Sequence, residues 1–373
     1  MVHSIPQLQR MGDITADLEV LAVRCSNAMN RATLLSAVRL IFRPVGETLS
    51  GSPGSHAVSL TSFLDIREVN DRVKILRPNE SRQIPMPIQA EPRSNRYMMV
   101  GTAFDYLLRF ELHRRAPHAV VNPWIAELAL DRLCPGVGKA VLDVFAQVPD
   151  FDLYLPPEEV GKRAKAIVDN AKTSVGTFLR TTSPTSQQLT NLAGHAIRLA
   201  KLDDAFRASR LELDFEQAAA EDVQDLLNML KLVPFDSLLH DTILHLNPHF
   251  SDSSKLIGGA DTDLIAGDLL IDFKVTKKPA MNAKDLDQLL GYYLLARRQR
   301  QLDPTFPDIR RTAIYYCRHG FLWELDAREW TMHPEFLDIE TWFFERANKE
   351  FGPFPSAQKT KKARGRSGKA AKK

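Results

Sequence analysis

The chain of 373 residues has few cysteines and no long apolar run. Its three cysteines, Cys25, Cys134 and Cys317, lie far apart in the sequence and match no metal-ligand spacing. A cluster that requires four cysteine ligands from one chain is therefore excluded, and a disulfide scaffold is not expected. Because no stretch of about 18 apolar residues is present and the N-terminus lacks an apolar signal core, we expect neither a membrane span nor secretion. Scattered thiols suit the reducing cytoplasm.

Nucleotide-binding and hydrolase motifs are also missing from the sequence. There is no phosphate-binding loop, no dinucleotide fingerprint, no GxSxG elbow and no internal repeat. By sequence the chain has no ATP-driven motor of its own, so coupling to a helicase or ATPase would need a separate partner. Hydrophobic residues make up 44% and charged residues 25%, which is typical of a globular protein, and the length indicates about two domains.

Positive charge is concentrated at the end of the sequence. The net charge is +3, yet residues 356–373 contain eight lysines and arginines and no acid, so the remaining residues carry a net charge of −5. The tail has no apolar residue larger than alanine and cannot bury enough surface to fold. We predict a disordered basic arm that binds nucleic-acid phosphates; the alternative is a tail that only improves solubility.

The most informative segment runs from Asp263 to Lys274. Apolar runs on either side of Gly267-Asp268 predict a two-stranded hairpin, because this dipeptide is typical turn chemistry. In that register Asp263 lies opposite Asp272, and their side chains share one face of the hairpin. Lys274 is two residues beyond Asp272 and projects from the same face. The pattern therefore brings two acids and one lysine together at one end of an apolar strand pair.

Burying these charges is unfavourable unless they bind a partner. The partner expected is Mg²⁺ or Mn²⁺ held by Asp263 and Asp272, because hard cations take carboxylate oxygens and retain water. Lys274 can then orient or deprotonate a metal-bound water, or hold a phosphate oxygen, which makes a site for phosphodiester hydrolysis. The alternative is an ordinary salt bridge on a solvated hairpin.

A helix is predicted to follow the hairpin. Asn282 and Asp285 have the spacing of a capping box, and the helix is expected to extend from Asp285 to about Arg300. Gln288 and Tyr292 are four residues apart and therefore share one side of this helix. A tyrosine on that side indicates either a functional surface or a second packing surface.

Taken in order, Asp263, then Asp272-Phe-Lys274, then Gln288-x-x-x-Tyr292 resemble the motifs of the PD-(D/E)xK nuclease superfamily in its RecB-like branch, without the iron–sulfur cysteines. The resemblance implies that Asp263 and Asp272 bind the metal and that Lys274 assists the attacking water. It also implies that Gln288 and Tyr292 position the nucleic acid or the metal-site residues. The implied activity is hydrolysis of DNA phosphodiester bonds, with RNA left open as a substrate. DNA repair and antiviral defence both use this chemistry.

The resemblance also implies a third metal-proximal residue on an earlier helix, four positions after a glycine. Gly101 places Asp105 there, where this branch often has histidine, and Glu111 on the same helix is the rival. We take Asp105 as the metal ligand and keep Glu111 as the alternative. Asp261 would replace Asp263 if the hairpin register slipped.

The resemblance implies an α/β fold with a restriction-endonuclease-like core, in which the order α-β-β-β-α-β surrounds a mixed central sheet. We expect these segments: an N-terminal extension at 1–95 with helices at 13–43 and 60–69, the nuclease core at 96–330, a helical insertion at about 119–235 that includes a helix at 138–147, a helical segment at 331–355, and the tail at 356–373. The first core helix is expected at 101–115. The last hairpin is expected around Arg318-His319-Gly320, with these turn residues exposed.

Two other classes of function fit the same residues. One is a catalytically inactive protein of the nuclease fold that binds nucleic acid or a protein partner, which the aspartate in place of histidine leaves open. The other is a metal-dependent hydrolase of small phosphate esters, against which the basic tail argues.

The basic tail gives a first prediction. Deletion of residues 356–373 should weaken DNA binding and flatten its dependence on salt, because fewer counterions are released from the phosphates. Binding titrations over a range of salt concentrations measure this slope. An unchanged slope would refute a phosphate-binding role for the tail.

Overall fold

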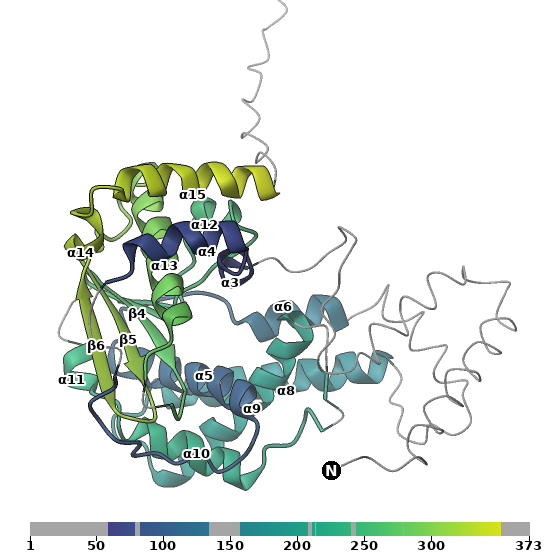
Figure 1. Cartoon of the computed structure of the whole chain (residues 1–373). Coiled ribbons are helices and arrows are strands. Elements are labelled where there is room, and N and C mark those ends of the chain that lie inside the picture. Colours follow the sequence, from purple (N-terminus) through teal and green to yellow (C-terminus); the bar gives the residue numbers. More distant parts are fainter. Residues whose placement is uncertain are drawn as a thin grey trace, which may run out of the picture. The chain divides into compact units, whose positions relative to one another are not determined.

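The structure is a computed structural model, and it describes residues 59–78, 83–133, 157–207, 211–212, 214–239, 244–278 and 280–351. These residues belong to two compact units, whose elements are labelled in Figure 1. The helices predicted at 13–43 and 138–147 and the basic tail lie outside the described residues. Within the described ranges, no helix combines the length and the apolar character needed to cross a membrane.

The first unit contains the described residues of Ala90–Pro117 and Pro123–Val233 and is built from helices. These helices are α5 (Tyr97–Arg115), α6 (Ile125–Leu133), α8 (Pro157–Phe178), α9 (Ser186–Arg207) and α10 (Ala220–Leu230). Helix α9 packs against each of the others, and its small buried residues Ala193, Ala196 and Ala200 allow close approach. The helix predicted to open the nuclease core, α5, is grouped with this unit.

The second unit contains the described residues of Ala57–Gln89, His118–Asn122 and Pro234–Lys373. Six strands of its described part form one sheet in the order β1 (Val120–Val121), β2 (Leu244–Leu246), β3 (Leu264–Ala266), β4 (Leu269–Lys274), β5 (Arg311–Tyr316) and β6 (Phe321–Asp326). The pairs β1/β2 and β4/β5 are parallel, and the other neighbours are antiparallel. The predicted α/β class with a mixed sheet is confirmed.

The hairpin of β3 and β4 has the predicted turn and register. Gly267 has a φ of 60°, in the left-handed region that glycine adopts without steric cost. Ile265 pairs with Leu270, so continuing the register by two residues sets Asp263 opposite Asp272. Both strands are buried except for Phe273 and Lys274 at the end of β4, so Asp272 is a charged residue within the buried part of the strand.

Helix α13 (Ala283–Leu302) connects the parallel strands β4 and β5 and packs against β5 (Figure 1). Its first turn has the predicted capping box. The Asn282 side chain accepts a hydrogen bond from the Lys284 backbone N–H, and the Asp285 side chain accepts one from the Asn282 N–H. These bonds fix the residue at which α13 begins.

Further helices surround α13. Helices α3 (Leu60–Leu64) and α4 (Arg67–Val73) pack against it, and α15 (Phe336–Phe351) packs against α4. The single helix predicted at 60–69 is therefore wrong, because Ile66 is extended and separates α3 from α4. The short helices of this unit are η1 (Lys74–Leu76), α11 (Phe235–Leu238), α12 (Ser251–Lys255) and α14 (Arg328–Thr331).

The turn between β5 and β6 differs from its prediction. Arg318 and His319 were expected to be exposed but are each only 1% exposed. The segment before α5 covers them: the Gln89 backbone N–H donates to the Arg318 carbonyl at 2.8 Å, and the Gln89 side chain donates to the His319 carbonyl at 2.9 Å. A ring nitrogen of His319 also lies 3.0 Å from the Met86 carbonyl. Turn chemistry alone does not reveal this cover, because it comes from residues distant in sequence.

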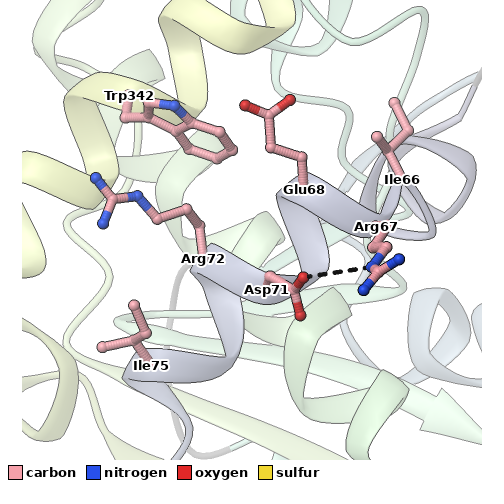
Figure 2. A pocket seen from close by; sticks show the side chains of 7 residues that line it. All are labelled: Ile66, Arg67, Glu68, Asp71, Arg72, Ile75 and Trp342. Carbon is pink, nitrogen blue, oxygen red and sulfur yellow. Dashed lines mark ion pairs between the residues drawn. The ribbon is translucent and has the colours of Figure 1, made fainter.

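An open groove of about 770 Å³ lies along α4 and α15 (Figure 2). The Arg67 and Asp71 side chains at its edge form an ion pair at 3.8 Å, and the Arg72 guanidinium lies 5.8 Å from the centroid of the Trp342 ring. None of the residues predicted to carry catalysis lines this groove. The groove and the predicted site are therefore separate features.

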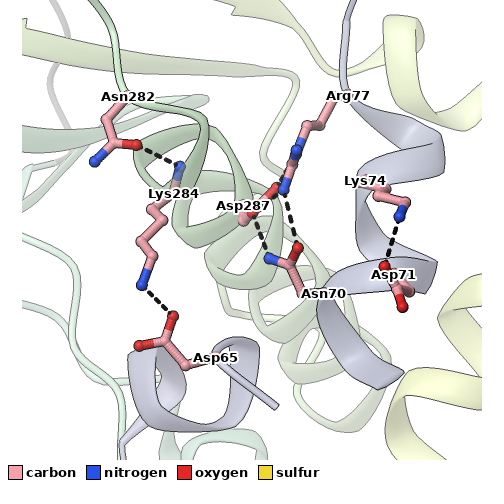
Figure 3. Close-up of polar contacts among 8 residues, drawn as sticks. All are labelled: Asp65, Asn70, Asp71, Lys74, Arg77, Asn282, Lys284 and Asp287. Atoms are coloured by element: carbon pink, nitrogen blue, oxygen red, sulfur yellow. Dashed lines mark hydrogen bonds and ion pairs between the residues drawn. The ribbon is translucent and has the colours of Figure 1, made fainter. Parts of the chain in front are cut away.

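A buried ion pair joins η1 and α4 to α13 (Figure 3). Asp287 on α13 has a side chain only 1% exposed and accepts two hydrogen bonds of 2.6 Å from the Arg77 guanidinium. The Asn70 side-chain amide donates a third at 3.1 Å to the same carboxylate. A bidentate arginine–carboxylate pair with an additional donor satisfies a buried charge well.

This pair gives a stability prediction. Arg77→Ala should lower the free energy of unfolding by about 3–5 kcal/mol, because it leaves the Asp287 carboxylate buried without its counter-charge. The matched control is Arg67→Ala, which removes an arginine that is 96% exposed and should change stability by less than about 1 kcal/mol. Chemical denaturation of both variants tests this. Equal losses of unfolding free energy in the two variants would contradict a stabilising role for the Arg77–Asp287 pair.

Candidate metal and active site

The face of β4 that carries Asp272 and Lys274 belongs to the apolar layer under α13. Asp272 pairs with Ile314 of β5, and Lys274 pairs with Tyr316. Both β5 residues are part of the core cluster that includes the apolar side of α13. The Asp272 side chain is 5% exposed and that of Lys274 is 21% exposed. Charges in such a layer require compensation from the protein or from a ligand.

Four of the predicted catalytic residues form a continuous chain of polar contacts. The Lys274 ammonium lies 2.7 Å from Asp272 Oδ2 and donates a hydrogen bond of 2.7 Å to Gln288 Oε1. Gln288 Nε2 in turn donates to the Tyr292 hydroxyl at 2.7 Å. The Tyr292 ring stacks on Phe250, with ring centroids 5.8 Å apart. The two residues of α13 therefore hold the lysine in place, and the ring stack holds the tyrosine.

Asp263 is anchored to the strand that carries this chain. Its carboxylate accepts a hydrogen bond from the backbone N–H of Phe273, the residue next to Asp272. Asp261, the alternative ligand, pairs with His249 in an isolated β-bridge, and its charge acts on Tyr292 as that of Asp263 does. Asp263 directly precedes β3, and its hydrogen bond to the β4 backbone beside Asp272 favours it as the second carboxylate.

The protonation of Lys274 follows from its surroundings. Burial alone would lower the pKa of its ammonium group, but nearby carboxylates, first Asp272 and then Asp285, outweigh burial and raise the pKa. Burial also raises the pKa of Tyr292, and the aspartates, Asp272 first, raise it further. Both groups therefore keep their protons at neutral pH. Without a bound metal, Lys274 is therefore a cation and a hydrogen-bond donor.

Asp285 joins the electrostatics of the site, which its sequence position did not suggest. Its predicted role was the helix cap alone, yet its pKa is raised, first by burial and also by Asp272, while Lys274 acts in the opposite direction. The signal that could have found it is spacing. Gln288 and Tyr292 follow Asp285 by three and seven residues, so the three side chains share one side of α13.

The predicted ligands belong to two different units of the structure. Asp105 and its rival Glu111 lie on α5 in the first unit, whereas the other site residues lie in the second. The Asp105 carboxylate lies 2.7 Å from the Arg109 guanidinium. Glu111 binds Arg114 at 2.6 Å and Arg115 at 2.7 Å, and its side chain is 5% exposed. Glu111 is thus engaged by two arginines within its own unit.

The donor set determines which metal the site suits. Among the described residues, no group of three or more histidines, cysteines and acids is arranged to hold a metal. Mg²⁺ commonly uses only one or two carboxylates and completes its shell with water and substrate phosphates. Asp272 Oδ2 is buried, and its approach to Lys274 lacks hydrogen-bond alignment, so this oxygen has no directed partner in the described structure. Asp263 and Asp272 therefore fit a hydrated hard cation and not a fully enclosed one.

No protein-family model, curated protein or solved structure matches the chain. An assignment of function therefore depends on the residues themselves and on their geometry.

The Asp272–Lys274 pair gives a prediction that does not depend on activity. Lys274→Met should lower the free energy of unfolding by about 3 kcal/mol, because Asp272 stays buried without its counter-charge. Adding Asp272→Asn to that variant should recover more than half of the loss. Chemical denaturation of the wild type, the two single variants and the double variant measures the coupling. Strictly additive effects would show that the two side chains do not interact.

Proposed function

We propose that this protein is a metal-dependent nuclease that hydrolyses DNA phosphodiester bonds. The observation that carries the proposal is the polar chain from Asp272 through Lys274 and Gln288 to Tyr292, beside Asp263 on the same strand pair. Four residues from two separate sequence motifs are in contact within one unit, and Asp263, from a third motif, is hydrogen-bonded to the backbone of Phe273 beside them. A salt bridge on a solvated hairpin would not need the amide and the buried phenol.

Each residue has a chemical role in this proposal. Asp263 and Asp272 would hold Mg²⁺ or Mn²⁺, which supplies a water nucleophile and neutralises charge on the phosphate when bound. Lys274, kept protonated by the surrounding carboxylates, donates to the attacking water or to a phosphate oxygen. Gln288 and Tyr292 position Lys274, because the amide accepts from the ammonium and donates to the phenol.

The arrangement of elements also supports a restriction-endonuclease-like core. Antiparallel β2, β3 and β4 are followed by α13 and by β5, which is parallel to β4. That order matches β-β-β-α-β of the expected core. We further propose a role in the cytoplasm, with the basic tail aiding contact with DNA and any motor supplied by a separate helicase or ATPase.

A second candidate function is binding of nucleic acid or a protein partner without cleavage. The observation in its favour is the small number of converging ligands: the described residues contain no group of three that could hold a metal. In that case the Lys274–Asp272 pair would serve stability alone.

The experiment is a cleavage assay on circular and end-labelled linear DNA, and on RNA, with Mg²⁺, Mn²⁺ or a chelator. Wild-type protein should cleave DNA only with metal. Lys274→Ala should lose at least about 100-fold in rate, because it removes the only cationic donor of the proposed chemistry.

Lys274→Arg is the control for folding in this assay. It keeps a positive charge beside Asp272, so circular dichroism should match the wild type while cleavage is still impaired. Wild-type cleavage by Lys274→Ala would contradict the proposal. Metal binding to the acids without cleavage of either nucleic acid would favour the binding function.

A further inference from the structure

The groove along α4 and α15 combines apolar and charged side chains (Figure 2). Ile66, Ile75 and Trp342 line it and are only partly buried, although they also pack against the core of the second unit. Apolar surface left in contact with water is unfavourable in proportion to its area. A partner that covers these three side chains would therefore be stabilised by the area that it removes from water.

Exposed apolar residues extend this area beyond the groove. Met332 and Leu337 lie on either side of the start of α15 and are 79% and 61% exposed. Glu335 lies between them in the sequence, and its carboxylate is 4.0 Å from the guanidinium of Arg72, which lines the groove. Exposed apolar residues that gather in one area are typical of a protein–protein interface. The groove, Met332 and Leu337 are together termed the α4/α15 surface.

Helix α4 contributes equal numbers of positive and negative charges to this surface, because Arg67 and Arg72 lie beside Glu68 and Asp71. Both arginines are held loosely. Arg67 lies 3.8 Å from Asp71, and Arg72 lies 4.0 Å from Glu335, and both distances exceed that of a hydrogen bond. A surface with both signs in equal number has no net attraction for a polyanion, but it can be complementary to a copy of itself.

We propose that the α4/α15 surface is the interface through which two copies of this chain associate. In a two-fold symmetric pair, residue i of one copy contacts residue j of the other, and j contacts i. Arg67 and Asp71 are four residues apart and lie on one side of α4. Antiparallel packing of the two α4 helices therefore places each Arg67 against Asp71 of the second copy and brings the apolar areas together. This inference does not depend on the proposed nuclease activity.

The size of the surface sets the expected affinity. A stable interface buries about 800 Å² on each partner. Helix α4 has 7 residues and α15 has 16, so they are about 10 and 24 Å long and offer a contact at the lower end of interface sizes. We therefore expect a reversible dimer with a dissociation constant of about 10–100 μM.

Sedimentation velocity of the full-length protein at about 1–300 μM measures this association. The wild type should change from monomer to dimer over the range. Leu337→Glu should weaken association at least about tenfold, because it places a charge within the apolar area. The matched control is Leu302→Glu, at a position on α13 that is 54% exposed and outside the α4/α15 surface. This control should leave the dissociation constant within about twofold of the wild type.

Charge reversal tests the pairing between the two copies. Arg67→Glu and Asp71→Arg should each weaken association at least about tenfold, because like charges then face each other in the dimer. A mixture of the two variants should associate to within about threefold of the wild type, since opposite charges face each other in the mixed dimer. The pair within each chain stays broken in the mixture, so recovery reports contact between copies.

Three outcomes would overturn the proposal. One is a wild-type protein that stays monomeric up to about 300 μM. Another is a dimer that is equally stable in the wild type, Leu337→Glu and Arg67→Glu, because association would then use a different surface. The third is a mixture of the Arg67→Glu and Asp71→Arg proteins that stays as dissociated as either variant alone. Circular dichroism that matches the wild type shows that each variant is folded.

Discussion

Charge buried within the layer between β4 and α13 must be compensated there, and the local structure of the site depends on this constraint. Asp272 lies in an apolar strand face, and its counter-charge, Lys274, is two residues further along the same strand. Gln288 and Tyr292 extend the pair into hydrogen bonds that reach α13. Loss of any member would leave a neighbouring polar group without its partner. These mutual contacts therefore fix the geometry of the site before a ligand binds.

Helix α13 is held by polar contacts on more than one side. Gln288 and Tyr292 join it to the site on β4, and Asp287, which projects from a different side, joins it to Arg77. The capping box at Asn282 fixes the helix start. The position of the site residues therefore depends on η1 and α4 as well as on the sheet, although these elements precede the site by about two hundred residues in the sequence.

Local patterns were sufficient to predict the core of the second unit. The turn at Gly267 and the cap at Asn282 each depend on neighbouring residues only, so the hairpin, its register and α13 could be derived from the sequence. Features created by distant residues could not. His319 is buried because Met86 and Gln89 contact its turn, and Asp285 enters the field of Lys274 and Asp272 only when β4 and α13 fold together.

The central claim is that Asp263 and Asp272 form one divalent-cation site. Its most direct test is anomalous diffraction from crystals of the wild-type protein soaked in Mn²⁺. The account predicts a manganese peak within coordination distance of both carboxylates, about 2.0–2.2 Å from their oxygens. Manganese bound only elsewhere, with Asp272 and Lys274 still in contact, would contradict it.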